Sequence, residues 1–262
     1  MASIDDQTYL VNEQYRDASN LLARADLHTR FSTNTYGWQR WVFDHFSMPA
    51  GARVLEVGCG PGLLWSENRE RIPADWAITL ADLSVGMIEQ AQRALGSEAA
   101  RFQFMVLDVQ AIPFPDASFD AVVANPMLYH VPDIARALVE IRRVLRPGGQ
   151  FFAATNGQGH LAEIHELRRR FDPGLDSWQS SFTLENGPSW LAPYFDHTVV
   201  DRYDDALAVT EAAPLIAYAL SHAASGNLSA ARRADFERMV VEELAARGTI
   251  HITKDSGLLE AW

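Results

Sequence analysis

The stretch Arg53-Val-Leu-Glu-Val-Gly-Cys-Gly-Pro-Gly62 decides the fold of this 262-residue chain. Its first half is a short apolar run typical of a buried β-strand, and its second half has a glycine at every second position. Glycine lets the backbone turn sharply and lets a ligand approach without a Cβ in the way. The helix expected after the glycines would present free amide hydrogens at its N-terminus. The stretch therefore predicts a strand, a ligand-binding turn and a helix.

The alternation of strands and helices continues downstream. Segments suited to helices begin at Ser84 and Asp133, residue types that favour helix N-caps. Apolar runs that fit strands lie at 76–81, 102–107, 119–124 and 150–155. This alternation predicts a parallel sheet with helices on both faces. We therefore expect an α/β, Rossmann-like domain with a mostly parallel sheet of about seven strands.

Four segments organise the chain around this pattern. Residues 50–157 hold the Rossmann-like core, and residues 1–49 are expected to form a helical cap over the ligand site. Residues 158–195 start with a helix over 158–172 and continue as a loop-rich segment, so we expect a substrate cap or insertion there. Residues 196–262 complete the same domain. They are predicted to contain strands at 197–203, 250–253 and 258–262, helices at 211–224 and 229–247, and an antiparallel edge.

Composition excludes several classes of protein. Acidic residues number 34 and basic residues 22, and the net charge of −12 opposes binding to nucleic acid. The sequence has no apolar run long enough to span a membrane, and its first residues lack the pattern of a signal peptide. The single cysteine, Cys59, can form no internal disulfide. We expect a cytoplasmic protein that binds neither nucleic acid nor membranes.

Two aspartates stand where a nucleoside could be held. Asp82 ends the second predicted strand and suits the hydroxyls of a ribose, whereas Asp108 ends the third and could accept an exocyclic amine. The glycine spacing differs from the Gly-x-Gly-x-x-Gly pattern of dinucleotide sites. Glu56, two residues before the first glycine, suits a cationic ligand such as an ammonium or a sulfonium. We expect these residues to border one crevice at the carboxyl ends of the strands.

Several segments together resemble the class I S-adenosylmethionine-dependent methyltransferases that act on small molecules. The matching segments are Val54-Leu-Glu-Val-Gly-Cys-Gly-Pro-Gly62, Leu80-Ala-Asp-Leu-Ser84 with Met87, 107–120 and Leu145-Arg-Pro-Gly-Gly149. The resemblance implies S-adenosyl-L-methionine as the cofactor. It also implies in-line transfer of the methyl group to a small molecule, for which we expect a secondary metabolite of natural-product biosynthesis.

The resemblance further implies which residues contact the cofactor. The methionine part would lie beside Glu56, Gly58, Cys59, Gly60 and Asn125. The ribose and adenine would lie beside Asp82, Leu83, Met87, Asp108 and Val109. Tyr15, in the N-terminal helical segment, would close over the cofactor.

The residues that act on the acceptor are less determined. Tyr129 and His130 follow the fourth predicted strand, and His130 could act as a general base or pack without a proton role. Glu163 and Glu166, on the helix expected over 158–172, could remove a proton from the acceptor. A base is needed only where the nucleophile must lose a proton.

Alternatives to this function stay open. One is a C-methyltransferase of an isoprenoid diphosphate, with a glutamate base and Mg²⁺ on the diphosphate. The others are a non-catalytic protein that binds S-adenosylmethionine and a nicotinamide-dependent dehydrogenase. No pattern such as His-Glu-x-x-His occurs, so no metal site on the protein is expected. The sequence identifies neither the acceptor, the methylated atom nor the oligomeric state.

Overall fold

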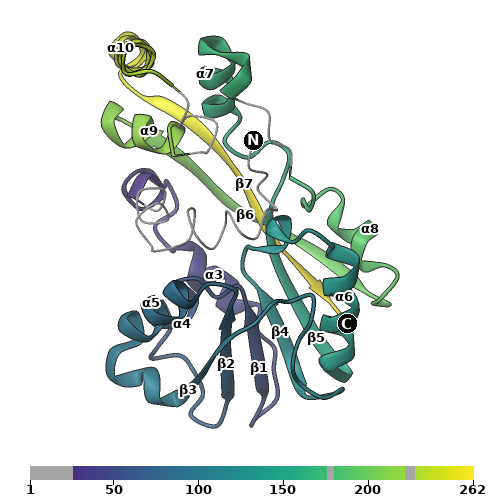
Figure 1. The fold of residues 1–262 in the computed structure, drawn as a ribbon. Helices are drawn as coiled ribbons and strands as arrows, with labels where there is room; N and C mark the ends of the chain where they lie inside the picture. The colour runs from purple at the N-terminus through teal and green to yellow at the C-terminus, as the bar shows by residue number, and fades with distance from the viewer. Residues whose placement is uncertain (1–25, 176–179, 222–227) are drawn as a thin grey trace.

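The computed structural model of the chain describes residues 26–175, 180–221 and 228–262. The seven strands in these residues form one sheet with the order β3-β2-β1-β4-β5-β7-β6 (Figure 1). The strands that pair in parallel are β1 (Arg53–Val57), β2 (Ala77–Asp82), β3 (Phe102–Val106), β4 (Phe119–Ala124) and β5 (Leu145–Asn156). Antiparallel β7 (Ile250–Ala261) lies between β5 and β6 (Thr198–Val209). The expected α/β fold, with its antiparallel C-terminal edge, is confirmed.

Helices cover both faces of the sheet, because successive residues of a buried strand point to opposite faces. Val54 faces a core formed with α3 (Trp38–Asp44), α4 (Leu63–Glu67) and α5 (Val85–Leu95). Leu55 faces the other core, formed with α6 (Ile134–Val144) and α8 (Gly187–Leu191). None of the helices in the described residues has the length and apolar character needed to cross a membrane.

The N-caps of α5 and α6 are those that the sequence indicates. The hydroxyl of Ser84 accepts a hydrogen bond from the Met87 amide at 3.3 Å. The carboxylate of Asp133 accepts one from the Arg136 amide at 2.9 Å. Each cap satisfies an amide that would otherwise lack a partner at the start of the helix. The loops that enter α5 and α6 therefore have fixed positions above β2 and β4.

The last strands are longer than expected. Short strands were expected on either side of Ser256-Gly257, but β7 runs through both residues as one 12-residue strand. A Cβ on Gly257 would lie 2.3 Å from the backbone oxygen of Asp201 on β6. The glycine therefore permits close contact between two strands rather than a turn. β6 likewise extends well beyond the predicted 197–203 and ends at Val209.

Beyond the end of β5, strands β6 and β7 pair with each other and build the upper part of the molecule (Figure 1), and Leu207 of β6 also forms an isolated bridge with Ser32. A third hydrophobic core joins this extension to helical residues 26–31 through Leu27 and Phe31. The same core includes α7 (Ala162–Phe171), α9 (Ala212–Ala219) and α10 (Ala230–Arg247). The carboxyl ends of the parallel strands point toward this upper part, since Asn156 at the end of β5 pairs with Ser256 in β7.

The described residues of segment 158–195 divide between two locations. Helix α7 packs in the upper core through Ile164 and Leu167. Residues 180–195 instead pack through Phe182 and Leu191 against the sheet face that α6 covers. Residues 180–195 therefore lie beside the sheet, and the Leu184 amide also donates to the carbonyl oxygen of Asn156 at the end of β5 at 3.1 Å.

Candidate active site

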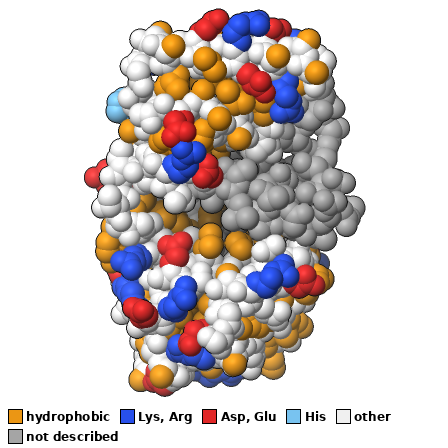
Figure 2. Space-filling view, turned by 90° about the vertical axis from the view of Figure 1, so that its left-hand side faces the viewer, with side chains coloured by type: hydrophobic (Ala, Val, Ile, Leu, Met, Phe, Trp, Pro, Cys, Tyr) orange, Lys and Arg blue, Asp and Glu red, His pale blue; other side chains and the backbone are white. Residues whose placement is uncertain are grey.

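A cavity of about 810 Å³ lies between the carboxyl ends of the parallel strands and the upper part. Seen from the side (Figure 2), the surface between the two parts is hollowed, and hydrophobic side chains lie within it. The volume is within the range of small-molecule and cofactor sites. Many of the residues predicted from the sequence line this one cavity: Glu56, Gly58, Cys59, Gly60, Asp82, Leu83, Met87, Asp108, Val109, Asn125, Tyr129 and His130.

The glycine loop presents backbone rather than side chains to the cavity. Gly58, Gly60 and Gly62 have φ values of 66°, 53° and 73°, in the left-handed region that favours glycine. A Cβ on Gly58 would lie 2.6 Å from Cγ of Met127, whereas one on Gly60 would meet no atom within 4 Å. Gly58 is therefore required for packing as well as for its conformation. Gly60 leaves open space in which a ligand can approach the backbone.

Asp82 joins two loops at the edge of the cavity. Its carboxylate accepts hydrogen bonds from the amide of Gly60 at 2.9 Å and from the amide of Ser84 at 2.8 Å. Burial raises the pKa of Asp82, and these amides offset only part of that rise. Carboxylate oxygens have further lone pairs, so the hydroxyls of a ribose could donate to Asp82 from the cavity.

Glu56 is a buried acid that also lines the cavity. The indole N–H of Trp65 donates to its carboxylate at 2.7 Å. Burial raises the pKa of Glu56 to about 8, so the side chain is mostly protonated at neutral pH. A bound ammonium would favour the ionised form. Burial also raises the pKa of the neighbouring Cys59 well above its ordinary value, which keeps its side chain a neutral thiol.

The third carboxylate lies one strand further along the sheet. Asp108 follows β3, the parallel neighbour of β2, and its Oδ1 accepts from the Gln110 amide at 2.9 Å. Val109 and Met87 are buried and line the same region of the cavity together with Leu83. An acidic group beside apolar walls suits an aromatic ring that carries an amine.

Helix α3 is tied across the cavity to the end of β4. The indole N–H of Trp38 donates to Oδ1 of Asn125 at 3.1 Å, and Nδ2 of Asn125 donates to Oε1 of Gln39 at 2.9 Å. The segment before β1 thus closes on the site through Trp38 and Gln39. Tyr15, for which this role was expected, lies outside the described residues. Tyr129 and His130 follow β4 and line the cavity, with ring centres 4.4 Å apart.

The far end of the cavity is formed by residues that sequence reasoning missed. They come from 26–34, the end of β5, the loop between β5 and α7, α9 and the β6–β7 pair: His28, Ser32, Asn34, Asn156, His160, Tyr203, Asp205, Tyr218, Lys254 and Ser256. Spacing along the chain gives no sign that these residues meet. The one available signal was compositional, since Lys254 is the only lysine of the chain.

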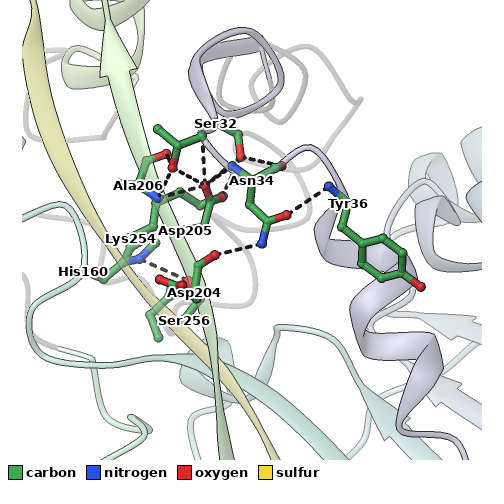
Figure 3. A network of polar contacts seen from close by, with 11 residues as sticks. Ser32, Asn34, Tyr36, His160, Asp204, Asp205, Ala206, Lys254 and Ser256 are labelled. Atoms are coloured by element: carbon green, nitrogen blue, oxygen red, sulfur yellow. Dashed lines mark hydrogen bonds and ion pairs between the residues drawn. The ribbon is translucent and has the colours of Figure 1, made fainter.

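A buried ion pair stands at this end (Figure 3). The side chains of Lys254 and Asp205 form the pair and are 9% and 0% exposed. Asp205 also accepts from the Ser32 hydroxyl at 2.7 Å and the Asn34 amide at 3.0 Å. Burial alone would raise the pKa of Asp205, but its hydrogen bonds with Lys254 and Ser32 outweigh burial and lower it. The ionised pair ties residues 32–34 to both β6 and β7.

Two neutral histidines lie beside this pair. The rings of His28 and His160 stack with their centres 6.2 Å apart. Burial first and then the charge of Lys254 lower the pKa of His28 to about 4. Burial, His28 and Lys254 together lower the pKa of His160 to about 3. Both imidazoles are therefore neutral at physiological pH.

Two buried polar atoms at this end have no hydrogen-bond partner among the described residues. They are Nδ1 of His28 and the hydroxyl of Tyr203. Tyr203 is 4% exposed and packs against Trp38 and Trp41, with ring centres 5.5 and 5.3 Å away. A buried polar group without a partner costs about 1–3 kcal/mol. Native structures rarely keep such groups without water or a ligand.

The structure does not bring Glu163 and Glu166 to the cavity. Glu163 accepts hydrogen bonds from the amide and the hydroxyl of Thr253, each at 2.8 Å. Glu166 pairs with Arg169 on the surface at 2.8 Å. Neither side chain lines the cavity, so the acid–base role expected for these glutamates finds no support in their placement. The isoprenoid alternative relied on one of these carboxylates as its base.

One group of potential metal ligands lies outside the cavity, although the sequence indicated none. The ligand atoms of His45, Asp201 and Glu260 lie within 4.8 Å of one another. Nδ1 of His45 is 2.8 Å from the carbonyl oxygen of Trp41, and Nε2 is 4.0 Å from Asp201. The three residues come from the end of α3, from β6 and from β7, so no local sequence motif could reveal them.

Comparison with known proteins relates this cavity to methyltransferases. Residues 55–153 match a family described as a methyltransferase domain. A malonyl-[acyl-carrier protein] O-methyltransferase of Pseudescherichia vulneris is 34% identical over 160 residues, which cover 60% of this chain and 61% of that protein. A ubiquinone/menaquinone biosynthesis C-methyltransferase of Hahella chejuensis is 34% identical over 115 residues, which cover 43% and 46%. The chain thus spans less than two thirds of either relative.

A solved structure with the same fold holds a methyl donor. Phosphoethanolamine N-methyltransferase 2 of Haemonchus contortus, in complex with S-adenosyl-L-methionine, superposes with a TM-score of 0.61 at 19% identity. The match covers all of this chain and 60% of that one. At this identity the likeness concerns the fold. The names of these three proteins describe methylation of oxygen, carbon and nitrogen, so they do not identify the acceptor of this chain.

Proposed function

Because the chain belongs to the class I S-adenosylmethionine-dependent methyltransferases, we propose that it transfers the methyl group of that cofactor to a small molecule bound in the same cavity. The observation that supports this most directly is the continuity of the cavity. One end has the glycine loop, Asp82 and Asp108, and the other has the polar residues around Lys254. A cofactor and an acceptor can therefore lie end to end.

The residues at the first end fit the cofactor. Gly60 offers open backbone, Asp82 offers lone pairs to a ribose, and Glu56 can ionise beside an ammonium. The cofactor supplies a methyl group activated by a sulfonium. During transfer, a bond forms between the acceptor atom and the methyl carbon, and the bond from that carbon to sulfur breaks.

The chain contributes alignment and the exclusion of water. Trp38 and Gln39 hold α3 against Asn125 on one side of the cavity. The Asp205–Lys254 pair holds residues 32–34 against β6 and β7 on the other. Alignment of two reactants and removal of water are the main contributions that a protein makes to such a displacement.

Binding of S-adenosylhomocysteine tests the cofactor end. Calorimetry should give one molecule per chain. Asp82→Asn should weaken binding by ~1.5–3 kcal/mol, the range for a hydrogen bond to a charged group. Asp196→Asn is the matched control, because Asp196 is exposed and outside the cavity. Equal affinity of the two folded variants would contradict the assignment.

Turnover distinguishes an enzyme from a non-catalytic binding protein. The chain would be incubated with S-adenosylmethionine carrying a labelled methyl group and with a small-molecule extract. Mass spectrometry should find a labelled product that depends on the wild-type chain and is reduced with Asp82→Asn. Tight binding of the cofactor without any labelled product would favour the non-catalytic alternative.

A further inference from the structure

The end of the cavity away from the glycine loop has a chemistry of its own. We name it the acceptor pocket and define it by His28, His160, Tyr203, Asp205 and Lys254, all of which line the cavity. Asn156, which borders it, ends β5, and Asn125 at the cofactor end directly follows β4, the neighbour of β5. Neighbouring strands lie about 4.8 Å apart, so the pocket adjoins the cofactor end.

We propose that the acceptor pocket holds the methyl acceptor by an anionic oxygen, that of a carboxylate, through hydrogen bonds from Lys254, Tyr203 and His28. This inference rests on the proposed function, since it names the class of molecule that lies beside the cofactor. It requires a cationic donor in the pocket, further donors without partners, and compensation of the negative charge of Asp205, the one carboxylate among the residues that define the pocket.

Lys254 supplies the charge. An ammonium has three N–H donors. Among the described residues Lys254 donates to Asp205, and the centre of the Tyr203 ring lies 5.7 Å from Nζ. Asp205 meanwhile accepts from the amides of Asn34 and Ala206 at 3.0 and 2.8 Å and from the Ser32 hydroxyl. The negative charge of Asp205 is thus shared among several neutral donors. Lys254 keeps donors that can meet a second anionic group.

Tyr203 and His28 supply neutral donors. The ordinary pKa of a tyrosine hydroxyl is about 10, so the hydroxyl of Tyr203 keeps its hydrogen at neutral pH. That O–H has no acceptor among the described residues. A neutral imidazole carries one N–H, and with the hydrogen on Nδ1, the atom without a partner, His28 also donates. Three residues with available donors, from three segments, therefore line one cavity.

Lys254 is the one lysine or arginine among the described residues that line the cavity, and Asp205 balances its charge. The charge of Lys254 lowers the pKa of both His28 and His160, whereas Asp205 raises that of His28. The net charge of the whole chain is −12. A carboxylate is ionised at neutral pH, so it can enter this pocket without giving up a proton. The pocket therefore needs no general base to bind it.

A set of matched aromatic probes tests the charge requirement. The full chain, saturated with S-adenosylhomocysteine, would be titrated with benzoate, with neutral benzamide and with cationic benzylamine. Calorimetry and saturation-transfer NMR would measure binding. We expect benzoate to bind at least tenfold more tightly than benzamide, and benzylamine to bind most weakly. An order that places benzamide level with benzoate, or no binding of benzoate, would overturn the inference.

Two variants test the donors without leaving a buried charge. Tyr203→Phe removes only the hydroxyl, and Asp205→Asn/Lys254→Met removes both members of the ion pair. Each should weaken benzoate binding roughly tenfold or more, the effect of losing a hydrogen bond to a charged group. Arg233→Met is the matched control, because Arg233 is exposed on α10. This variant should bind benzoate as the wild type does.

The outcome is separable from that of the proposed function. S-adenosylhomocysteine should bind wild type and all of these variants within twofold, because the substitutions lie at the other end of the cavity. Failure of the wild type to bind S-adenosylhomocysteine would count against the proposed function. Benzoate could then still be titrated without S-adenosylhomocysteine, which would test the acceptor pocket separately. Normal cofactor binding with wild-type benzoate affinity in both pocket variants would count against this inference only.

Discussion

The two ends of one cavity are built in opposite ways. The cofactor end has carboxylates, Glu56, Asp82 and Asp108, each placed on or directly after a strand by the local sequence. The acceptor pocket has one buried lysine and neutral histidines, brought together from segments as far apart as Ser32 and Asp205, 173 residues along the chain. An acidic end suits a cationic cofactor, and an end that offers an ammonium and neutral hydrogen-bond donors suits an anionic acceptor.

The two ends differ in how closely ligand binding is coupled to the stability of the fold. At the cofactor end the loop presents open backbone at Gly60, so we expect substitutions there to act locally. In the acceptor pocket the same ion pair both lines the cavity and joins residues 32–34 to the β6–β7 pair. Substitutions in the pocket should therefore affect folding as well as binding, and the following predictions separate the two effects.

The largest effect is expected from Lys254→Met. It would leave Asp205, whose side chain is 0% exposed, without its cationic partner. Removal of one member of a buried ion pair typically costs about 3–5 kcal/mol of unfolding free energy. Urea denaturation should show this loss, and Asp205→Asn/Lys254→Met should recover much of it. If the single variant is as stable as the double variant, the ion pair does not stabilise the fold, and the acceptor pocket is not coupled to stability.

Gly58→Ala should have the next largest effect, at the cofactor end. Alanine would be forced to a φ of 66° and its Cβ would lie 2.6 Å from Cγ of Met127. The left-handed backbone costs about 1–2 kcal/mol, and overpacking adds about 1–3 kcal/mol. Gly60→Ala is the control, because it has the same backbone cost but meets no atom within 4 Å. Denaturation should rank Gly58→Ala below Gly60→Ala, and equal stabilities would contradict the role of Met127.

Glu56 should couple cofactor binding to pH. Its pKa of about 8 in the empty site means that it is mostly protonated at pH 7. The ammonium of S-adenosylhomocysteine favours the carboxylate, so binding at pH 7 should release up to one proton. Affinity should therefore rise as pH increases toward 8. Calorimetry in two buffers of different ionisation enthalpy measures the proton, and Glu56→Gln should abolish it. Binding without proton release in the wild type would show that Glu56 does not meet the ammonium.

The same group should affect stability in a defined direction. Its pKa in the folded chain lies above the ordinary value of 4.5, so the folded state holds the proton more tightly than the unfolded state. The stabilisation that this proton gives is complete below pH 4.5 and is lost as pH rises through about 8. Unfolding free energies of the wild type and Glu56→Gln should therefore diverge as pH increases over that interval. Parallel curves would contradict the burial of an ionisable acid.

Local sequence patterns predicted the cofactor end because its carboxylates lie in or shortly after strands, and each strand can be recognised from its own apolar run. Asp82 ends β2 and Asp108 lies two residues past the end of β3, and the parallel pairing of these strands brings both to one edge. The upper part could not be predicted in this way. Gly257 indicated a turn, but its lack of a Cβ serves close packing against Asp201. The Ser256 hydroxyl donates to Oδ1 of Asn156 at 2.8 Å, although the two residues are 100 positions apart in the sequence. Contacts of this kind produce no local sequence pattern.

The smallest effect is expected from Glu166→Gln, and it tests the boundary of the acceptor pocket. Glu166 and its partner Arg169 are 54% and 55% exposed, so solvent screens their interaction and the loss of stability should be at most a few tenths of a kcal/mol. Glu166 lies outside the lining of the cavity, so benzoate and S-adenosylhomocysteine should bind as they do to the wild type.

Glu163→Gln is the companion variant, because Glu163 accepts from Thr253, the residue next to Lys254. A loss of benzoate affinity in Glu166→Gln would extend the pocket to α7 and restore the acid–base role that the structure argues against. A loss in Glu163→Gln alone would instead show that Thr253 positions Lys254.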